Sequence, residues 1–177
     1  MAIILGVDPG LTRCGFGLID TSKNEAIQFG MFQSMPSSDP RDRVGVIAAE
    51  LKLLVIEHKP EMIALERVFA QANLRSVMGV AQVSGALMAI AFEADIPLQF
   101  FTPSEVKAAV TGNGRATKEQ VALMVTRILK LQETPKPADV ADALAVAICA
   151  SKRGLSVGTS AQQQWVAAAK KASRRLG

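Results

Sequence analysis

Two short apolar runs that each end in a carboxylate restrict how this chain folds more than any other feature. Residues 3–7 read Ile-Ile-Leu-Gly-Val and precede Asp8, and residues 62–65 read Met-Ile-Ala-Leu and precede Glu66. Short apolar runs of this kind are typical of strands buried inside a sheet. Alternating strand and helix units bring the carboxyl ends of such strands to one edge, where α/β folds bind ligands. We therefore expect Asp8 and Glu66 to meet at one sheet edge.

The order of patterns along the chain predicts an α/β fold. Turns join three expected strands, which indicates an antiparallel meander; these strands span residues 2–8, 14–20 and 26–34. Apolar residues at helical spacing follow over about 41–58, and two further strands are expected, one ending at Glu66 and one at 97–102. The remaining helices are expected at about 76–94, 103–110, 117–131 and 137–153. This order predicts a five-stranded mixed sheet with helices on both faces.

Length and composition favour one folded domain followed by a basic tail. A chain of 177 residues with 49% hydrophobic residues can bury a single core, which we expect within residues 1–153. Residues 154–177 contain four Lys and Arg residues and no acid. We expect this segment to be flexible, and it either stays solvated or makes nonspecific phosphate contacts.

Net charge and cysteine content restrict the partners, metal sites and cellular location that we expect for the protein. Lys and Arg (20) exceed Asp and Glu (16) by four, which permits a polyanionic partner without requiring one. One histidine and two distant cysteines do not make a zinc cluster. Gly6, Asp8 and Pro9 interrupt the first apolar run, so no signal peptide is expected. We expect a cytoplasmic protein with free thiols.

Two further acids, Asp139 and Asp142, lie three residues apart in the last helical pattern and therefore share one face. With Asp8 and Glu66 they would form an anionic cluster that repels itself at a low local dielectric unless cations hold it. Mg²⁺ prefers oxygen ligands and pairs them with substrate phosphates, with Mn²⁺ as a substitute. Two such ions would clamp a phosphodiester for in-line hydrolysis. We expect activity that rises with pH and stops with a chelator.

Each acid also has a simpler explanation when it is taken alone. Asp8 begins an Asp-Pro-Gly stretch that suits a turn. Glu66 would be costly to bury without a partner, and an ion pair with Arg67 or another base would satisfy it. Asp139 and Asp142 would complement the dipole of a helix start. A shared carboxylate cage explains all four positions at once.

Binding of phosphate also needs cations, and Lys107, Arg115 and Lys118 flank a Gly-Asn-Gly loop at 112–114. Glycine lets the backbone approach a ligand closely. Thr117 is expected to cap the helix that begins at Lys118, whose first amides would add donors for phosphate. The alternative is a solvated basic loop.

Phe69 lies just beyond Glu66 in a loop pattern. A phenylalanine is most often a core residue. An exposed ring beside a cleavage site would instead stack on an unpaired base, a contact worth ~1–3 kcal/mol. The residues alone allow both interpretations.

The helix expected at 76–94 is apolar on nearly all sides, whereas one apolar face suffices for a surface helix. Two explanations are open. The helix is completely buried inside the monomer, or its outer face is buried against a second copy in a homodimer. Its apolar stretch is short for a membrane span, so no membrane partner is expected.

Three segments of the chain carry the acids in a recognisable order. They are residues 6–10, Gly-Val-Asp-Pro-Gly, with Gly15 and Gly17 after them; residues 65–69, Leu-Glu-Arg-Val-Phe; and residues 138–145, Ala-Asp-Val-Ala-Asp-Ala-Leu-Ala. These segments resemble the opening motif, the second acidic motif and the third motif of the RuvC family of Holliday-junction resolvases. The resemblance spans about residues 2–153. It implies a ribonuclease H-like nuclease domain that makes paired symmetric nicks in four-way DNA junctions during recombination and repair, depends on Mg²⁺ and leaves ligatable 5′-phosphate ends.

The resemblance also implies roles for single residues and partners. The four catalytic acids of the family fall on Asp8, Glu66, Asp139 and Asp142. Some members carry His at the position that matches Asp139, where this chain supplies another oxygen ligand. Lys107 and Lys118 match positions that hold DNA, and Phe69 matches an aromatic residue at the junction centre. A homodimer and a branch-migration complex of RuvA and RuvB are the implied partners.

Three other functions fit parts of the sequence. A hydrolase from another branch of the same fold, acting on RNA, would need similar acids, although the Asp139 and Asp142 pair and Phe69 favour the resolvase. Residues 6–10 also resemble the first phosphate loop of actin-like ATPases and sugar kinases, which need a second lobe and loop that these 177 residues do not provide. A junction-binding protein without catalysis is the third, and the intact set of acids argues against it.

Overall fold

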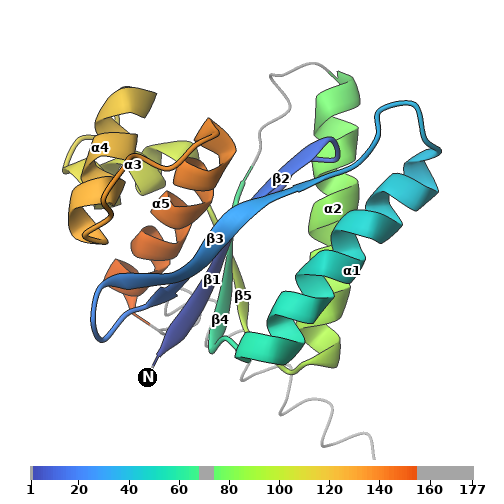
Figure 1. Cartoon of the computed structure of the whole chain (residues 1–177), viewed down its shortest axis with the longest axis horizontal. Coiled ribbons are helices and arrows are strands. Elements are labelled where there is room, and N and C mark those ends of the chain that lie inside the picture. Colours follow the sequence, from blue (N-terminus) through green and yellow to red (C-terminus); the bar gives the residue numbers. More distant parts are fainter. Residues whose placement is uncertain (1, 68–73, 155–177) are drawn as a thin grey trace, which may run out of the picture.

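The computed structural model describes residues 2–67 and 74–154, and a five-stranded sheet forms its centre (Figure 1). The strands, in chain order, are β1 (Ile3–Asp8), β2 (Arg13–Asp20), β3 (Glu25–Gln33), β4 (Met62–Glu66) and β5 (Leu98–Phe101). Their order in the sheet is β3-β2-β1-β4-β5. The first three strands are antiparallel neighbours, whereas β4 is parallel to both β1 and β5. The expected mixed sheet is confirmed.

Helices cover both faces of this sheet, as predicted (Figure 1). Within the described residues they are α1 (Pro40–His58), α2 (Leu74–Glu93), α3 (Pro103–Thr111), α4 (Lys118–Ile128) and α5 (Ala138–Arg153). One face packs against α1 and α2, and the other packs against α5, which α3 and α4 cover in turn. The two faces therefore have separate apolar cores.

Alternation along β1 explains how one strand serves both cores. Ile3, Leu5 and Val7 pack with α1 and α2, whereas Ile4 belongs to the cluster around α5. Successive side chains of a strand point to opposite faces, so a strand that is apolar on both sides must be central. The first apolar run of the sequence is such a strand.

The close approach of α5 to the sheet depends on glycine. A Cβ atom on Gly15 would lie 2.1 Å from the carbonyl oxygen of Asp139, and one on Gly6 would lie 2.2 Å from that of Ala143. Only a residue without a side chain fits at these contacts. Residues 140–150 of α5 are buried apart from Asp142, so the helix is enclosed between the sheet and α3 and α4.

The outer face of α2 is exposed. Met78, Met88 and Phe92 are 56%, 51% and 88% exposed, whereas Val83 and Leu87 on the inner face are buried. Complete burial of this helix inside the monomer is therefore wrong, because α2 is an outer layer whose inner face packs on the sheet, on α1 and on Leu11 in the turn between β1 and β2. In the described part of the chain, none of the helices has the length and apolar character needed to cross a membrane.

Candidate active site

The first two acids lie side by side at the carboxyl ends of β1 and β4. The two strands are parallel neighbours. Ile4 and Ala64 pack into the cluster around α5. Because side chains alternate along a strand, Asp8 and Glu66, which follow at even spacing, take the same face. Both acids therefore project toward the side of the sheet that α5 covers.

The other two acids come from the first turns of α5, which lie over the end of β1. Gly15 pairs with Asp8 across the β1–β2 ladder, and its Cα faces the backbone of Asp139. The side chains of Asp139 and Asp142 are 23% and 21% exposed, so this end of the sheet is partly open to solvent. Strand ends and a helix start thus bring acids from three distant segments together.

Mutual repulsion shows that the four acids share one electrostatic environment. Burial, and then the charges of Glu66, Asp142 and Asp139, raise the pKa of Asp8 to about 7. Burial and the charge of Asp142 also raise the pKa of Glu66. These shifts have the causes expected of neighbouring carboxylates at low dielectric.

The two lysines expected to bind DNA lie beside the acids. Lys118 donates a hydrogen bond of 2.9 Å from Nζ to Asp142 Oδ2, and this bond, with the attraction of Asp8 and Glu66, raises the pKa of Lys118. Lys107 on α3 lies close enough that its charge lowers the pKa of Glu66 against the larger effect of burial. Both lysines are therefore placed where they could contact a phosphate group that lies next to the acids.

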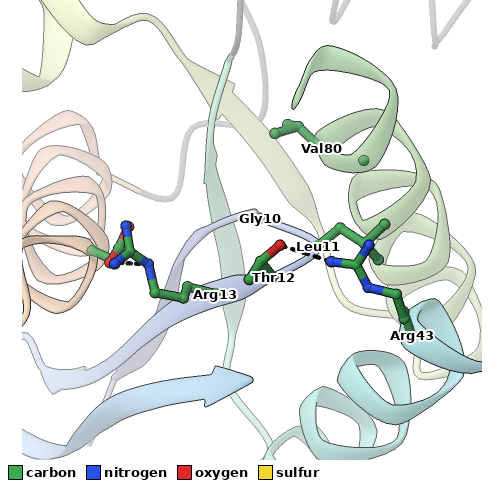
Figure 2. Close-up of a pocket in the computed structure, with 8 residues that line it drawn as sticks. Gly10, Leu11, Thr12, Arg13, Arg43 and Val80 are labelled. Carbon is green, nitrogen blue, oxygen red and sulfur yellow. Dashed lines mark hydrogen bonds and ion pairs between the residues drawn. The ribbon is translucent and has the colours of Figure 1, made fainter. Parts of the chain in front are cut away.

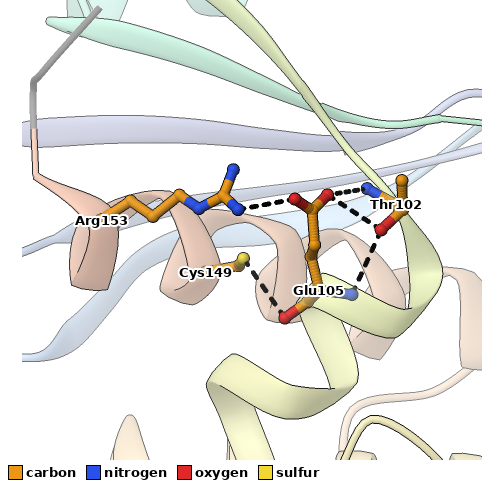
Figure 3. Close-up of polar contacts among 4 residues, drawn as sticks. All are labelled: Thr102, Glu105, Cys149 and Arg153. Carbon is orange, nitrogen blue, oxygen red and sulfur yellow. Dashed lines mark hydrogen bonds and ion pairs between the residues drawn. The ribbon is translucent and has the colours of Figure 1, made fainter. Parts of the chain in front are cut away.

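The capping of two helices positions these lysines. Thr117 caps α4 as predicted, in a reciprocal pair with Gln120, so that Lys118 begins the helix. Thr102 and Glu105 form the same arrangement at the start of α3. Figure 3 shows that Glu105 also accepts from Arg153 at the end of α5, and that the Cys149 thiol donates to the Glu105 carbonyl oxygen at 3.7 Å. The helix that carries Lys107 is thus attached to α5 at its first turn.

The remaining expected residues do not add to the cluster of acids and lysines within the described part of the chain. Arg115 is in the exposed loop between α3 and α4, where its backbone amide binds Asn113 Oδ1 at 3.0 Å. Phe69 lies outside the described residues. Arg67 does not pair with Glu66 in the described ion pairs; its guanidinium lies 5.8 Å from the centre of the Phe100 ring. The proposed ion pair between Glu66 and Arg67 therefore does not explain the half-buried Glu66.

Arg13 is a residue of this site that the sequence analysis missed. Its Nε lies 3.3 Å from Asp139 Oδ2. It begins β2, directly after the turn that follows Asp8, and an antiparallel pairing of β1 with β2 was expected. The sequence pattern that could have revealed Arg13 is therefore a basic residue that a tight turn places close to Asp8. What the sequence lacked was the position of α5 over that turn.

The carboxylates have the chemistry of a divalent cation site, although the side chains are turned to protein cations. Among residues 2–67 and 74–154, no three acidic, histidine or cysteine side chains are already arranged to hold a metal ion. Asp139 and Asp142 are directed at Arg13 and Lys118 instead. All four donors are hard carboxylate oxygens, and the repulsion that raises the pKa of Asp8 is what a divalent cation would relieve. The metal cage stays a prediction.

Known proteins match this chain along most of its length. Residues 4–150 match the family model "Crossover junction endodeoxyribonuclease RuvC". The crossover junction endodeoxyribonuclease RuvC of Salinispora arenicola is 47% identical over 177 residues, covering 98% of both chains. That of Frankia alni is 47% identical over 154 residues, covering 85% of this chain and 78% of its own. The solved structure of Thermus thermophilus RuvC in complex with a Holliday junction substrate matches with a TM-score of 0.79 and 35% identity, over 84% of this chain and 92% of that chain.

Proposed function

Because the chain belongs to the RuvC family of crossover junction endodeoxyribonucleases, we propose that it resolves four-way DNA junctions by hydrolysing one phosphodiester bond in each of two symmetric strands. Its mixed sheet and helices form a ribonuclease H-like fold. The observation that best supports the proposal is the shared environment of Asp8, Glu66, Asp139 and Asp142 at one sheet edge beside Lys107 and Lys118.

Members of this family depend on a metal, and we assign its binding to the four carboxylates. Mg²⁺, with Mn²⁺ as a substitute and two ions per site, would supply water of lowered pKa and neutralise the leaving oxygen. The protein itself positions these carboxylates and frees them to bind the metal. Asp8 and Glu66 are fixed at the ends of strands, whereas Asp139 and Asp142 exchange their partners Arg13 and Lys118 when DNA offers phosphate to those cations.

The remaining DNA contacts follow from the family resemblance and from position. Lys107 and Lys118 would hold phosphates of the cut strand next to the acids. Arg115, exposed in the loop between α3 and α4, would contact backbone farther along. Phe69, outside the described residues, would stack on an unpaired base at the junction centre.

We also propose that two copies assemble through the outer face of α2. Met78, Met88 and Phe92 give this face an exposed apolar strip. The two active sites of a twofold dimer are related by the same symmetry as the two strands that are cut in a junction. A RuvA and RuvB branch-migration complex as partner rests on the resemblance, and the cytoplasm as setting rests on the two free cysteines, Cys14 and Cys149.

The test is cleavage of end-labelled DNA by the purified full chain. A synthetic four-way junction, a linear duplex and a single strand are incubated with Mg²⁺, with Mn²⁺ and with a chelator. We expect paired nicks at symmetric positions in the junction only, sealed afterwards by ligase, and no cutting in chelator. Cutting that persists in chelator, or equal cutting of linear duplex, would contradict the proposal, and preferential cutting of an RNA substrate would favour the alternative hydrolase.

Matched variants separate catalysis from binding. Asp8→Asn keeps the size of the side chain, so we expect junction binding to persist and cutting to vanish. Asp95→Asn is the control, because Asp95 is an exposed acid in the turn after α2 at φ 54°, a conformation that asparagine also adopts. We expect that variant to cut at the rate of the unmodified protein.

A further inference from the structure

A cavity of about 350 Å³ lies beside Asp139, and neither Lys107 nor Lys118 lines it. Its walls come from the β1–β2 turn and from α1, α2 and the start of α5 (Figure 2). The lining residues are Gly10, Leu11, Thr12, Arg13, Arg43, Gly79, Val80 and Asp139. Since Asp139 forms part of the wall, the cavity is continuous with the candidate active site.

The guanidinium of Arg43 is held in place by hydroxyl groups. It donates from Nη2 to Thr12 Oγ1 at 2.7 Å and from Nε to Ser34 Oγ at 3.0 Å. Ser34 Oγ in turn donates to the carbonyl oxygen of Leu11. Figure 2 shows Thr12 between Arg13 and Arg43, with Arg43 directed at the Thr12 hydroxyl. Arg43 is therefore preorganised against the turn that leads from Asp8 to Arg13.

The charge of Arg43 is not neutralised as that of Arg13 is. Arg13 pairs with Asp139, whereas the ion pairs of the described residues include none with Arg43. The two hydroxyl contacts use two of the five N–H donors of a guanidinium, so donors remain for a ligand. With Asp139 balanced by Arg13, the cavity has a net positive wall.

We propose that Arg43, with the Thr12 hydroxyl, forms a binding subsite for a non-scissile phosphate of the DNA strand that crosses the acids. A fixed guanidinium fork matches two phosphate oxygens and binds them with charge-assisted hydrogen bonds. Lys118 and Arg43 then hold the strand on opposite sides of the acids, one from the layer of α4 and one from the layer of α1. The inference rests on the proposed junction-cutting function.

Binding of a labelled junction in chelator, measured against salt concentration in the Asp8→Asn background, tests the subsite. Adding Arg43→Gln should weaken binding about tenfold, as expected for a hydrogen bond to a charged group. It should also reduce the slope of log K against log salt by about 1. Arg41→Gln is the matched control, because Arg41 is an exposed arginine in the same helix turn that does not line the cavity.

A scan of methylphosphonates along the cut strand identifies the contact. One neutral linkage near the cleavage site should weaken binding by the protein with Arg43 and have little further effect with Arg43→Gln. If circular dichroism shows that Arg43→Gln does not fold, Arg43→Lys replaces it. This variant should lose less binding at the neutral linkage than the unmodified protein does, because an ammonium group lacks the two-pronged donor geometry of a guanidinium. The subsite is overturned if Arg43→Gln has the same salt slope and methylphosphonate pattern as Arg41→Gln. It is also overturned if Arg43→Lys leaves the loss of binding at that linkage unchanged. Failure of the unmodified protein to bind or cut junctions instead overturns the proposed function.

Discussion

At the residue scale, burial and neighbouring acids raise the pKa of Asp8 to about 7. An unfolded aspartate has a pKa of about 4, so the folded chain holds this proton more tightly. Stability therefore falls as pH rises from about 4 to about 7, and the loss persists above that range. In chelator, we expect Asp8→Asn to melt several degrees higher than the unmodified protein at pH 8 and to lose this advantage near pH 4, with about 2–4 °C for each kcal/mol.

Asp95→Asn serves as the control for this melting experiment, since its carboxylate is exposed in the turn after α2 and is not among the charges that shift the pKa of Asp8. We expect its melting temperature to follow that of the unmodified protein at every pH. Parallel curves for Asp8→Asn and the unmodified protein would show that Asp8 is not destabilised by its neighbours.

Lys118 also acts at the residue scale, through its 2.9 Å hydrogen bond to Asp142. An exposed ion pair contributes little to stability, so we expect Lys118→Gln to change the melting temperature by only a few degrees. If Lys118 binds phosphate, the same change should weaken junction binding at all sequences and flatten its salt dependence by about 1 in slope. Lys23→Gln, in the turn at the opposite end of β2, is the control. An unchanged slope for Lys118→Gln would exclude Lys118 from the interface.

At the element scale, the position of α5 depends on the missing side chain of Gly15. A Cβ atom there would lie 2.1 Å from the carbonyl oxygen of Asp139, so Gly15→Ala must displace the first turn of the helix. We expect a loss of ~1–3 kcal/mol in stability from overpacking and a larger loss in cutting rate, since two acids move with the turn. Melting temperature and initial cutting rate are the measurements.

Gly45→Ala in α1 is the matched control, because a Cβ atom there would meet no atom within 4 Å apart from its chain neighbours and the backbone of its own helix. Alanine in a helix interior is more favourable than glycine by roughly 0.5–1 kcal/mol, so this variant should be slightly stabilised and fully active. Gly15→Ala with normal stability and normal cutting would mean that the start of α5 does not govern the site.

At the scale of the whole molecule, the exposed face of α2 predicts the assembly. Phe92 is 88% exposed, a large apolar surface for a single side chain. Phe92→Glu should convert a dimer to a monomer at micromolar concentration in light scattering and should abolish paired nicking. Leu123→Glu, on α4 across the sheet and 47% exposed, is the control and should remain dimeric. A monomeric unmodified protein would defeat this assembly.

Sequence periodicity was sufficient to predict the helices and strands, but it did not predict every side-chain contact in the site. The strand predicted at 97–102 is Leu98–Phe101, and the helix predicted at 117–131 is Lys118–Ile128, because apolar spacing is a local property. The approach of Asp8 to Glu66 followed from a general rule for parallel strands. The contacts of Arg13 with Asp139 and of Arg43 with Thr12 required the packing of α5 and α1 around the β1–β2 turn, which no local pattern encodes.

The enclosure of α5 has a consequence for how the protein fails when it is heated. The helix that supplies Asp139 and Asp142 has ten buried residues between the sheet and the layer of α3 and α4, so its loosening would expose both of these layers. Thermal inactivation and collapse of the molecule are then one cooperative event. We therefore expect the loss of cutting activity on heating to follow the same curve as the loss of helix signal in circular dichroism.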